Sequence, residues 1–246
     1  EILDLKYLYL ETNSKVYYNT NLSEGVSFVS SQIQANINKY AESTELNRYG
    51  ARFKYSQFLR IIDQSHESIT SNITTVQMRR DLGLAVNIFA EYAIDFGNEF
   101  HIQSMGGYNI RSSAFRVLNI SDDVYLFDVP STNRRTGTIS LYSLPSEQSQ
   151  TPVVRRRNVG TIDYMRGQIK LNPINIVAGK SKNNQQIMEI YAIPHSNDVI
   201  GLQDLYLQLD ISDVEMIVDP ISSGIDPSGS SYATSSSYIN VNKNPY

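Results

Sequence analysis

The spacing of hydrophobic residues in the first third of the chain changes from strand-like to helix-like and back. Residues 3–10 are apolar at most positions of both alternating sets, which predicts a strand covered on both faces, followed by a turn at 11–14. A five-turn amphipathic helix is predicted after this turn, with Ser23 as N-cap and Glu24 in its first turn. Its apolar residues recur at spacings of three and four: Val26, Val29, Ile33, Ile37 and Tyr40.

The next elements complete a mixed unit. A shorter helix is predicted over 54–63, and alternating or β-branched residues predict strands over 73–80 and 91–96. The first 96 residues therefore predict an α+β unit of the order strand–helix–helix–strand–strand, with the helices packed on one face of a sheet.

Beyond residue 96 the helical spacing disappears and short strands alternate with turn residues, which predicts a mainly antiparallel β domain over 97–221. Met165-Arg166-Gly167 is interpreted as a hairpin loop. We expect four prolines at strand ends: Pro130, Pro152, Pro173 and Pro194. The expected strands are 124–129, 138–142, 158–164, 168–171, 186–193, 204–211 and 214–218. The pattern leaves open whether the last strands return to the first sheet, which would make this domain an insertion.

Residues 222–246 form a third segment rich in Ser, Gly, Asn and Tyr. Such a composition buries too little apolar surface to offset the entropy of ordering by itself. We therefore expect Tyr232, Tyr238 and Ile239 to anchor this tail on a neighbouring subunit. Between the first two segments, the loop containing Gly97, Gly106 and Gly107 is the predicted hinge.

Composition narrows the class of protein. The chain has 17 Tyr and 8 Phe but no Trp and no Cys, and its formal net charge is −4. The lack of Cys excludes disulfides and thiolate chemistry, and we expect no nucleic-acid partner, although Arg155-Arg156-Arg157 is a short basic run. No apolar stretch predicts a membrane span and no signal peptide is indicated. Since the sequence opens without Met in a strand-like run, we expect a fragment or processed product.

Candidate chemistry is sparse. His66 lies beside Asp63 and Glu67, which could form a metal or general-base site, but a solvated helix end is the favoured interpretation. His101, expected in a loop, and His195, expected in a turn at a strand end, are likewise interpreted as structural. Residues 219–224 resemble a calcium loop only weakly, because Ile221 stands where an oxygen ligand is needed, and Asp122-Asp123 is typical of a turn. We predict no catalytic residue, no cofactor, no metal site and no small-molecule substrate.

Several segments resemble the C-terminal half of the ring-forming wedge subunit of T-even-type phage baseplates. The resemblance is carried by short stretches spread over almost the whole chain: Lys6–Thr12, Ser14–Tyr18, Phe53–Phe58, Ser68–Val76, Met78–Arg80, Phe89–Tyr92, Gly107–Arg111, Thr136–Thr138 and Val159–Tyr164. The first 96 residues also resemble the α+β unit of the broader baseplate J family.

This resemblance implies a virion protein of a contractile tail that is assembled in the host cytoplasm. It implies homodimers that link wedges into a ring around the hub, contacts with other wedge proteins, and a part in the shape change on contraction. The main alternative is a carbohydrate- or receptor-binding β module of a tail adhesin, in which Tyr rings stack on sugars. A cell-wall hydrolase is the third hypothesis, and it predicts a cleft with paired carboxylates.

Overall fold

The structure is a computed structural model, and it describes residues 6–103, 108–144, 151–202 and 205–224. Its helices are α1 (Val26–Ala41) and α2 (Tyr55–Asp63). Its longer strands are β1 (Lys6–Tyr18), β3 (Ile69–Gly83), β4 (Phe89–Asp95), β7 (Tyr125–Pro130), β8 (Thr136–Ser143), β9 (Val153–Asp163), β10 (Gln168–Ala178), β12 (Gln185–Ala192) and β14 (Leu205–Val218). The short strands are β2 (Arg52–Phe53), β5 (Arg111–Ser112), β6 (Arg116–Val117), β11 (Lys180–Lys182) and β13 (Val199–Ile200).

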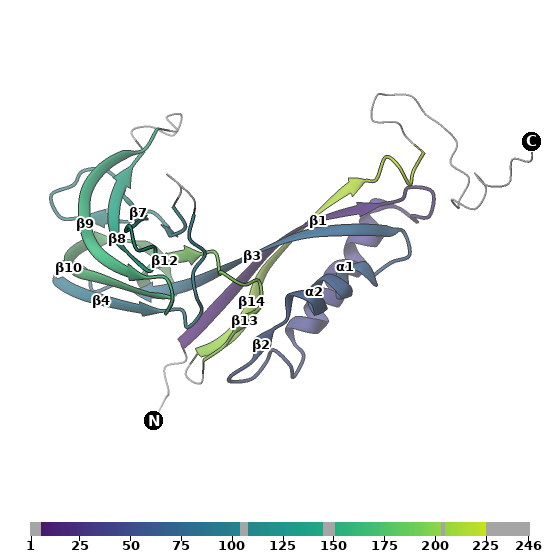
Figure 1. The fold of residues 1–246 in the computed structure, drawn as a ribbon, viewed down its shortest axis with the longest axis horizontal. Coiled ribbons are helices and arrows are strands. Elements are labelled where there is room, and N and C mark those ends of the chain that lie inside the picture. The colour runs from purple at the N-terminus through teal and green to yellow at the C-terminus, as the bar shows by residue number, and fades with distance from the viewer. Residues whose placement is uncertain (1–5, 104–107, 145–150, 203–204, 225–246) are drawn as a thin grey trace, which may run out of the picture. The chain divides into compact units, whose positions relative to one another are not determined.

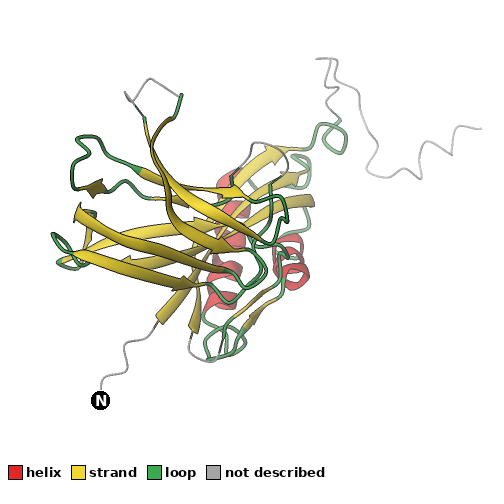
Figure 2. Cartoon of the chain, turned by 60° about the vertical axis from the view of Figure 1, so that its left-hand side comes forward, coloured by secondary structure: helices red, strands yellow, loops and turns green. Residues whose placement is uncertain are grey.

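The strands form two large sheets and one short pair. The first sheet has the order β11-β12-β3-β1-β14, with β5 paired to β12. The second has the order β4-β10-β9-β8-β7, with β6 paired to β10, and β13 pairs with β2. Figure 2 shows the predominance of strands over helices. The predicted α+β class with an antiparallel β-rich part is therefore confirmed.

Strand order also decides two expectations about the sheets. β12 and β14 lie in the same sheet as β3 and β1, so the last strands do return to the first sheet. The expected place of strand 91–96 beside the first strands is wrong, because β4 pairs with β10 instead. Its alternating pattern revealed a strand but not a partner, which is set by contacts far away in the sequence.

The chain divides into two compact units that are interleaved in sequence, whereas the predicted division is into consecutive segments. Unit 1 comprises residues 1–11, 44–53 and 76–210, and unit 2 comprises 12–43, 54–75 and 211–246. The chain therefore passes from one unit to the other within β1, β3 and β14.

Unit 2 has helices on one face of its strands (Figure 1). Val29, Ile33, Ile37 and Tyr40 of α1 are buried, as their spacing predicts, and so are Phe58 and Ile62 of α2. The same core contains buried hydroxyl side chains on the strands. The Thr74 Oγ1 atom lies 2.8 Å from the Ser14 Oγ atom, and Thr12 Oγ1 donates to Ser212 Oγ over 3.0 Å. We call Thr12, Ser14, Thr74 and Ser212 the hydroxyl seam.

The hydroxyl seam explains why the predicted turn at 11–14 is wrong. β1 continues as a strand to Tyr18, because these polar side chains find partners on β3 and β14. The expected cover on both faces is also wrong. Burial alternates along β1, with Leu8 and Leu10 fully buried and Tyr7 and Tyr9 only half-buried, which is typical of an antiparallel strand with one face on the core.

Helix α1 does not begin as predicted. Its N-cap is Gly25, which has a φ of 123° and no side-chain cap, and no acidic residue lies in the first turn. Ser23 is not the N-cap, since its Oγ instead accepts the N–H of Gly25 in a local turn before the helix. Val26, expected on the buried stripe, is 45% exposed.

Unit 1 holds most of the buried apolar residues, and many of these lie on β4, β7–β10, β12 and the first half of β1. The hairpin at Met165–Gly167 is confirmed, and Gly167 has the positive φ (66°) that the turn requires. A Cβ there would lie 1.9 Å from the Asn98 carbonyl oxygen, so no other residue fits.

Two details of the predicted strands in this part are wrong. Pro173 lies inside β10 rather than at its end, at a register shift between Leu171 and Ile174 that accommodates its missing N–H. The two strands expected over 204–211 and 214–218 are one strand, β14, because Ser212-Asp213 continues the extended backbone.

Candidate functional site

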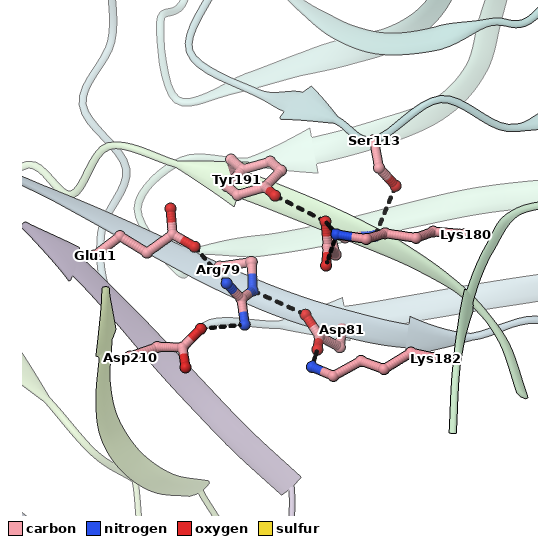
Figure 3. Close-up of polar contacts among 9 residues, drawn as sticks. Glu11, Arg79, Asp81, Ser113, Lys180, Lys182, Tyr191 and Asp210 are labelled. Carbon is pink, nitrogen blue, oxygen red and sulfur yellow. Dashed lines mark hydrogen bonds and ion pairs between the residues drawn. The ribbon is translucent and has the colours of Figure 1, made fainter. Parts of the chain in front are cut away.

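A cluster of charged side chains lies across the first sheet within unit 1, and we call it the Arg79 cluster. It consists of Glu11 on β1, Arg79 and Asp81 on β3, Asp210 on β14 and Lys182 on β11 (Figure 3). Arg79 donates through Nε to Asp81 over 3.0 Å, through one terminal nitrogen to Asp210 over 2.7 Å, and through the other to Glu11. Lys182 lies 2.6 Å from the second oxygen of Asp81. One guanidinium thus ties together three neighbouring strands.

Burial makes these ion pairs consequential for stability. The Arg79 side chain is only 6% exposed, and the carboxylates of Glu11 and Asp81 are 17% and 14% exposed. Burial lowers the pKa of Arg79, but the neighbouring Asp81, Asp210 and Glu11 outweigh burial and raise it above its ordinary value. The hydrogen bond to Asp81 likewise raises the pKa of Lys182. Both cations therefore stay charged at any physiological pH.

A second buried carboxylate lies beside the cluster, on β12. Glu189 accepts from Lys180 Nζ at 2.7 and 2.9 Å and from the Tyr191 hydroxyl at 2.9 Å (Figure 3). Its backbone N–H donates to the Ser113 hydroxyl. Burial, followed by the hydrogen bond to Glu189, raises the pKa of Tyr191 well above its usual range. The hydroxyl is therefore a permanent donor and not a base.

Four tyrosine rings of unit 1 form a chain of contacts that begins at the Arg79 guanidinium. The Arg79 guanidinium lies 4.5 Å from the centre of the Tyr9 ring, which stacks on Tyr7 at 5.7 Å. Tyr206 meets the edge of Tyr7 at 5.6 Å and that of Tyr49 at 5.7 Å. Tyr49 is 53% exposed. These four rings are mainly engaged with one another and with cations, which is a structural arrangement rather than an open sugar platform.

A third polar node lies deep in unit 1, at Asp128 on β7. Its Oδ1 accepts the backbone N–H groups of Asn109 and Ile110, both over 2.7 Å, and its Oδ2 accepts the Tyr164 hydroxyl over 2.6 Å. Burial and the adjacent Asp128 raise the pKa of Tyr164 far above its usual range. This node fastens the segment before β5 to β7 and to the end of β9.

The residues singled out in the sequence have local structural roles. His66 Nδ1 accepts the N–H of Ser68 after α2, while its ring meets the edge of Phe28. His101 and His195 are exposed, and their backbone N–H groups bond to Ile193 and Glu99. Within the described ranges no three His, Cys, Asp or Glu residues are grouped to bind a metal ion.

The acidic turns are also structural. Asp219 Oδ1 accepts the N–H groups of Ile221 and Ser222, and its Oδ2 accepts the Thr70 hydroxyl. In the segment that weakly resembles a calcium loop, both carboxylate oxygens of Asp219 are therefore engaged in hydrogen bonds within the chain. Asp122 pairs with Arg155, and Asp123 pairs with Arg116 over 2.8 Å.

Of the predicted hinge and anchor residues, the structure describes Gly97. Gly97 has a φ of 63° and lies within unit 1, where a Cβ would be 2.3 Å from the Leu202 side chain. Gly106 and Gly107 lie outside the described residues, and so do the expected anchors Tyr232, Tyr238 and Ile239. The contacts around Gly97 add no support for a hinge at that residue.

Sequence reasoning missed the Arg79 cluster and the Asp128 node. Two of the three carboxylates that pair with Arg79 lie far from it in sequence, Glu11 on β1 and Asp210 on β14, so no local motif marks them. One signal was present, since Arg79-Arg80-Asp81 puts three charges inside an otherwise strand-like run. Charges in a strand that is buried in a sheet must be paired.

A comparison with known protein families found a match for the first part of the chain. Residues 6–81 match baseplate structural protein gp6, C-terminal domain III. The match covers β1, α1, β2, α2 and all of β3 except its last two residues. It supports a structural role in a phage tail baseplate, a place in the virion, and contacts with other baseplate proteins.

The limits of the gp6 match are equally plain. It spans residues 6–81 only, and the resemblance to the broader baseplate J family has no such support. No curated protein matches the chain. Neither described helix has the length and apolar character that crossing a membrane requires. Because the gp6 family is one of structural proteins, the match agrees with the prediction that the chain is not an enzyme.

Proposed function

We propose that the chain is a structural subunit of a contractile-tail baseplate wedge, which pairs as a homodimer and links wedges into a ring around the hub. The match of residues 6–81 to gp6 C-terminal domain III carries this proposal. We further propose that the subunit assembles in the host cytoplasm with other wedge proteins and takes part in the shape change on contraction.

The surface of unit 2 supports a role in assembly. Its large apolar side chains are exposed almost as often as they are buried. Those that are exposed are Leu22, Val26, Phe28, Ile73, Ile211, Val218 and Ile221, with exposed fractions from 37% to 61%. Apolar residues of this size at an association surface are stabilised when a partner removes them from water. We therefore place the homodimer contact on unit 2.

Two sets of residues complete the proposal. Tyr232, Tyr238 and Ile239 would anchor the C-terminal tail on a neighbouring subunit, and the segment with Gly97, Gly106 and Gly107 would serve as the hinge. The adhesin alternative gains no support from the described rings, because the Tyr7, Tyr9 and Tyr206 rings contact one another.

Sedimentation equilibrium of the whole chain, from low micromolar to near-millimolar concentration, tests the proposal. We expect a concentration-dependent dimer. The variant Val26→Ser/Phe28→Ser should weaken dimerisation, because it removes apolar surface from unit 2. Its matched control is Ile88→Ser/Phe89→Ser, which makes the same kind of change at residues of unit 1 that are 57% and 69% exposed. A chain that stays monomeric throughout would contradict self-association.

A further inference from the structure

The first half of β9 has a free, basic edge. β9 pairs with β10 only at Gly160–Asp163, so Val153–Asn158 has no strand on that side within the described residues. Every residue from Val153 to Asn158 is exposed. Figure 1 shows the position of β9. We call Val153–Arg157, which reads Val-Val-Arg-Arg-Arg, the basic edge. Asn158 is left out because its φ is 56° and its carbonyl oxygen accepts the Asn172 side chain of β10.

The charges of the basic edge are only partly neutralised. Arg155 pairs with Asp122, but both side chains are more than one third exposed. Arg156 and Arg157 have no ion pair in the part of the chain that the structure describes. An unpaired strand edge exposes N–H and C=O groups that can pair with another strand, and charges on it select the partner.

The second half of β14 has an acidic edge on which the described residues place no further strand. β14 is the last strand of the first sheet, and none of its residues from Gln208 onward is buried. This half carries Asp213 and Glu215 among apolar residues, of which Ile211 is 44% exposed. Within the described part of the chain, the one ion pair of Glu215 is with Lys15, at 3.8 Å, and both of these side chains are more than half exposed. We call residues 211–218 the acidic edge.

We propose that the basic edge of one copy pairs, as an added antiparallel strand, with the acidic edge of another copy. Setting Arg155 opposite Glu215 also sets Arg157 opposite Asp213 and Val153 opposite Ile217. In the same register, Val154 faces Met216 and Arg156 faces Val214. Two opposite-charge pairs and two apolar pairs result, each of a kind that stabilises antiparallel strands, beside one mixed pair of Arg156 with Val214.

This contact rests on the proposed self-association and adds to it. Two different surfaces meet, so the contact is heterologous, and repetition of a heterologous contact produces a closed ring or an open chain. A homodimer contact on unit 2 is isologous and stops at two copies. A second copy fits the basic edge better than a nucleic acid does, because the chain as a whole has a net charge of −4.

Cysteine cross-linking tests which surfaces meet. The chain has no Cys, so Val154→Cys and Met216→Cys each introduce one thiol. When the two variants are mixed with a mild oxidant, we expect a disulfide-linked dimer with one chain of each kind. Either variant alone should give little cross-linked product. No product in the mixture, or equal product from one variant alone, would overturn the heterologous contact.

Charge reversal supplies an independent measurement of the same contact. Arg155→Glu/Arg157→Glu and Asp213→Arg/Glu215→Arg should each weaken association beyond the dimer by at least about tenfold, because like charges then face each other. A mixture of the two variants should restore it. The control Arg134→Glu/Arg135→Glu makes the same change of net charge as Arg155→Glu/Arg157→Glu, at an exposed turn of unit 1, and should have no effect.

The outcomes separate this contact from the proposed function. A wild-type chain that dimerises, with charge-reversal variants that associate as it does, overturns the edge contact alone. A wild-type chain that remains monomeric overturns both.

Discussion

Unit 1 and unit 2 use the same three strands, β1, β3 and β14, in different ways. In unit 1 they carry charged side chains that pair around Arg79, beside an extensive apolar core. In unit 2 they carry the hydroxyl seam beneath α1 and α2, and a smaller apolar core. The buried polar groups differ as well, because those on the shared strands are ion pairs in unit 1 and neutral hydroxyls in unit 2.

This difference indicates that the two units have different roles, one mainly in stability and the other mainly in association. Unit 1 pairs its buried charges and buries a larger share of its large apolar side chains than unit 2 does. Among the described residues, unit 2 leaves a larger share of its large apolar side chains exposed, and such exposed apolar surface is typical of association sites. The contrast can be tested by weakening each unit separately, and the changes that follow run from the largest expected effect to the smallest.

Removal of the central cation should be the most damaging change to unit 1. Arg79→Ala leaves three carboxylates near one another without their shared partner, and we expect a loss of about 3–5 kcal/mol in the free energy of unfolding. Urea denaturation measures this loss. Arg79→Lys keeps the charge but not the three-way geometry, so it should cost less. Equal losses in the two variants would mean that charge alone matters.

A matched pair of core truncations compares the two units directly. Ile33→Ala on α1 and Ile139→Ala on β8 each remove a fully buried side chain, at an expected cost of about 2–4 kcal/mol. Hydrogen exchange should show faster exchange mainly in residues 12–43 and 54–75 for Ile33→Ala, and mainly in 76–210 for Ile139→Ala. Uniform acceleration in both variants would indicate one cooperative block instead of two units.

In the hydroxyl seam of unit 2, the losses of stability caused by two substitutions should not add. Thr74→Val leaves the buried Ser14 hydroxyl without its Thr74 partner, which we expect to cost about 1–3 kcal/mol. Adding Ser14→Ala removes the orphaned group, so the double variant should lose less than the sum of the single variants. Thermal unfolding of the four proteins measures the coupling. Strict additivity would show that the two hydroxyls do not interact.

The smallest effect is expected at Asp219 in unit 2. Burial raises the pKa of Asp219, but hydrogen bonds from Thr70, Ser222 and Ile221 outweigh burial and lower it below 3.8. A lowered folded-state pKa gives stabilisation that is present above the unfolded value and is lost as the pH falls through the folded value. Asp219→Asn should therefore be slightly less stable at neutral pH and equal to wild type in strong acid. A difference independent of pH would contradict this.

Local spacing in the sequence predicted the elements whose partners are close. The stripe of Val29, Ile33 and Ile37 is a property of one helix, and the Gly167 turn is a property of four residues. What spacing could not provide was pairing across long sequence separations. The turn expected at 11–14 is a strand because Ser14 meets Thr74, 60 residues away, and Thr12 meets Ser212, 200 residues away.

The same reason limited prediction of the site. Arg79 meets carboxylates on β1 and β14, and nothing near it in sequence indicates them. The baseplate role came from a resemblance carried by short stretches, and the gp6 match supports it over residues 6–81. The basic run at Arg155–Arg157 was visible in the sequence, but its position on a free strand edge required the strand order.

The passage of the chain between units within β1, β3 and β14 has a practical consequence for anyone who dissects the molecule. No single continuous stretch of the sequence encodes either unit, since both are assembled from separate pieces. Truncation at one position would cut a strand and leave both halves with missing backbone partners. Isolating unit 2 would require joining its three pieces with new linkers.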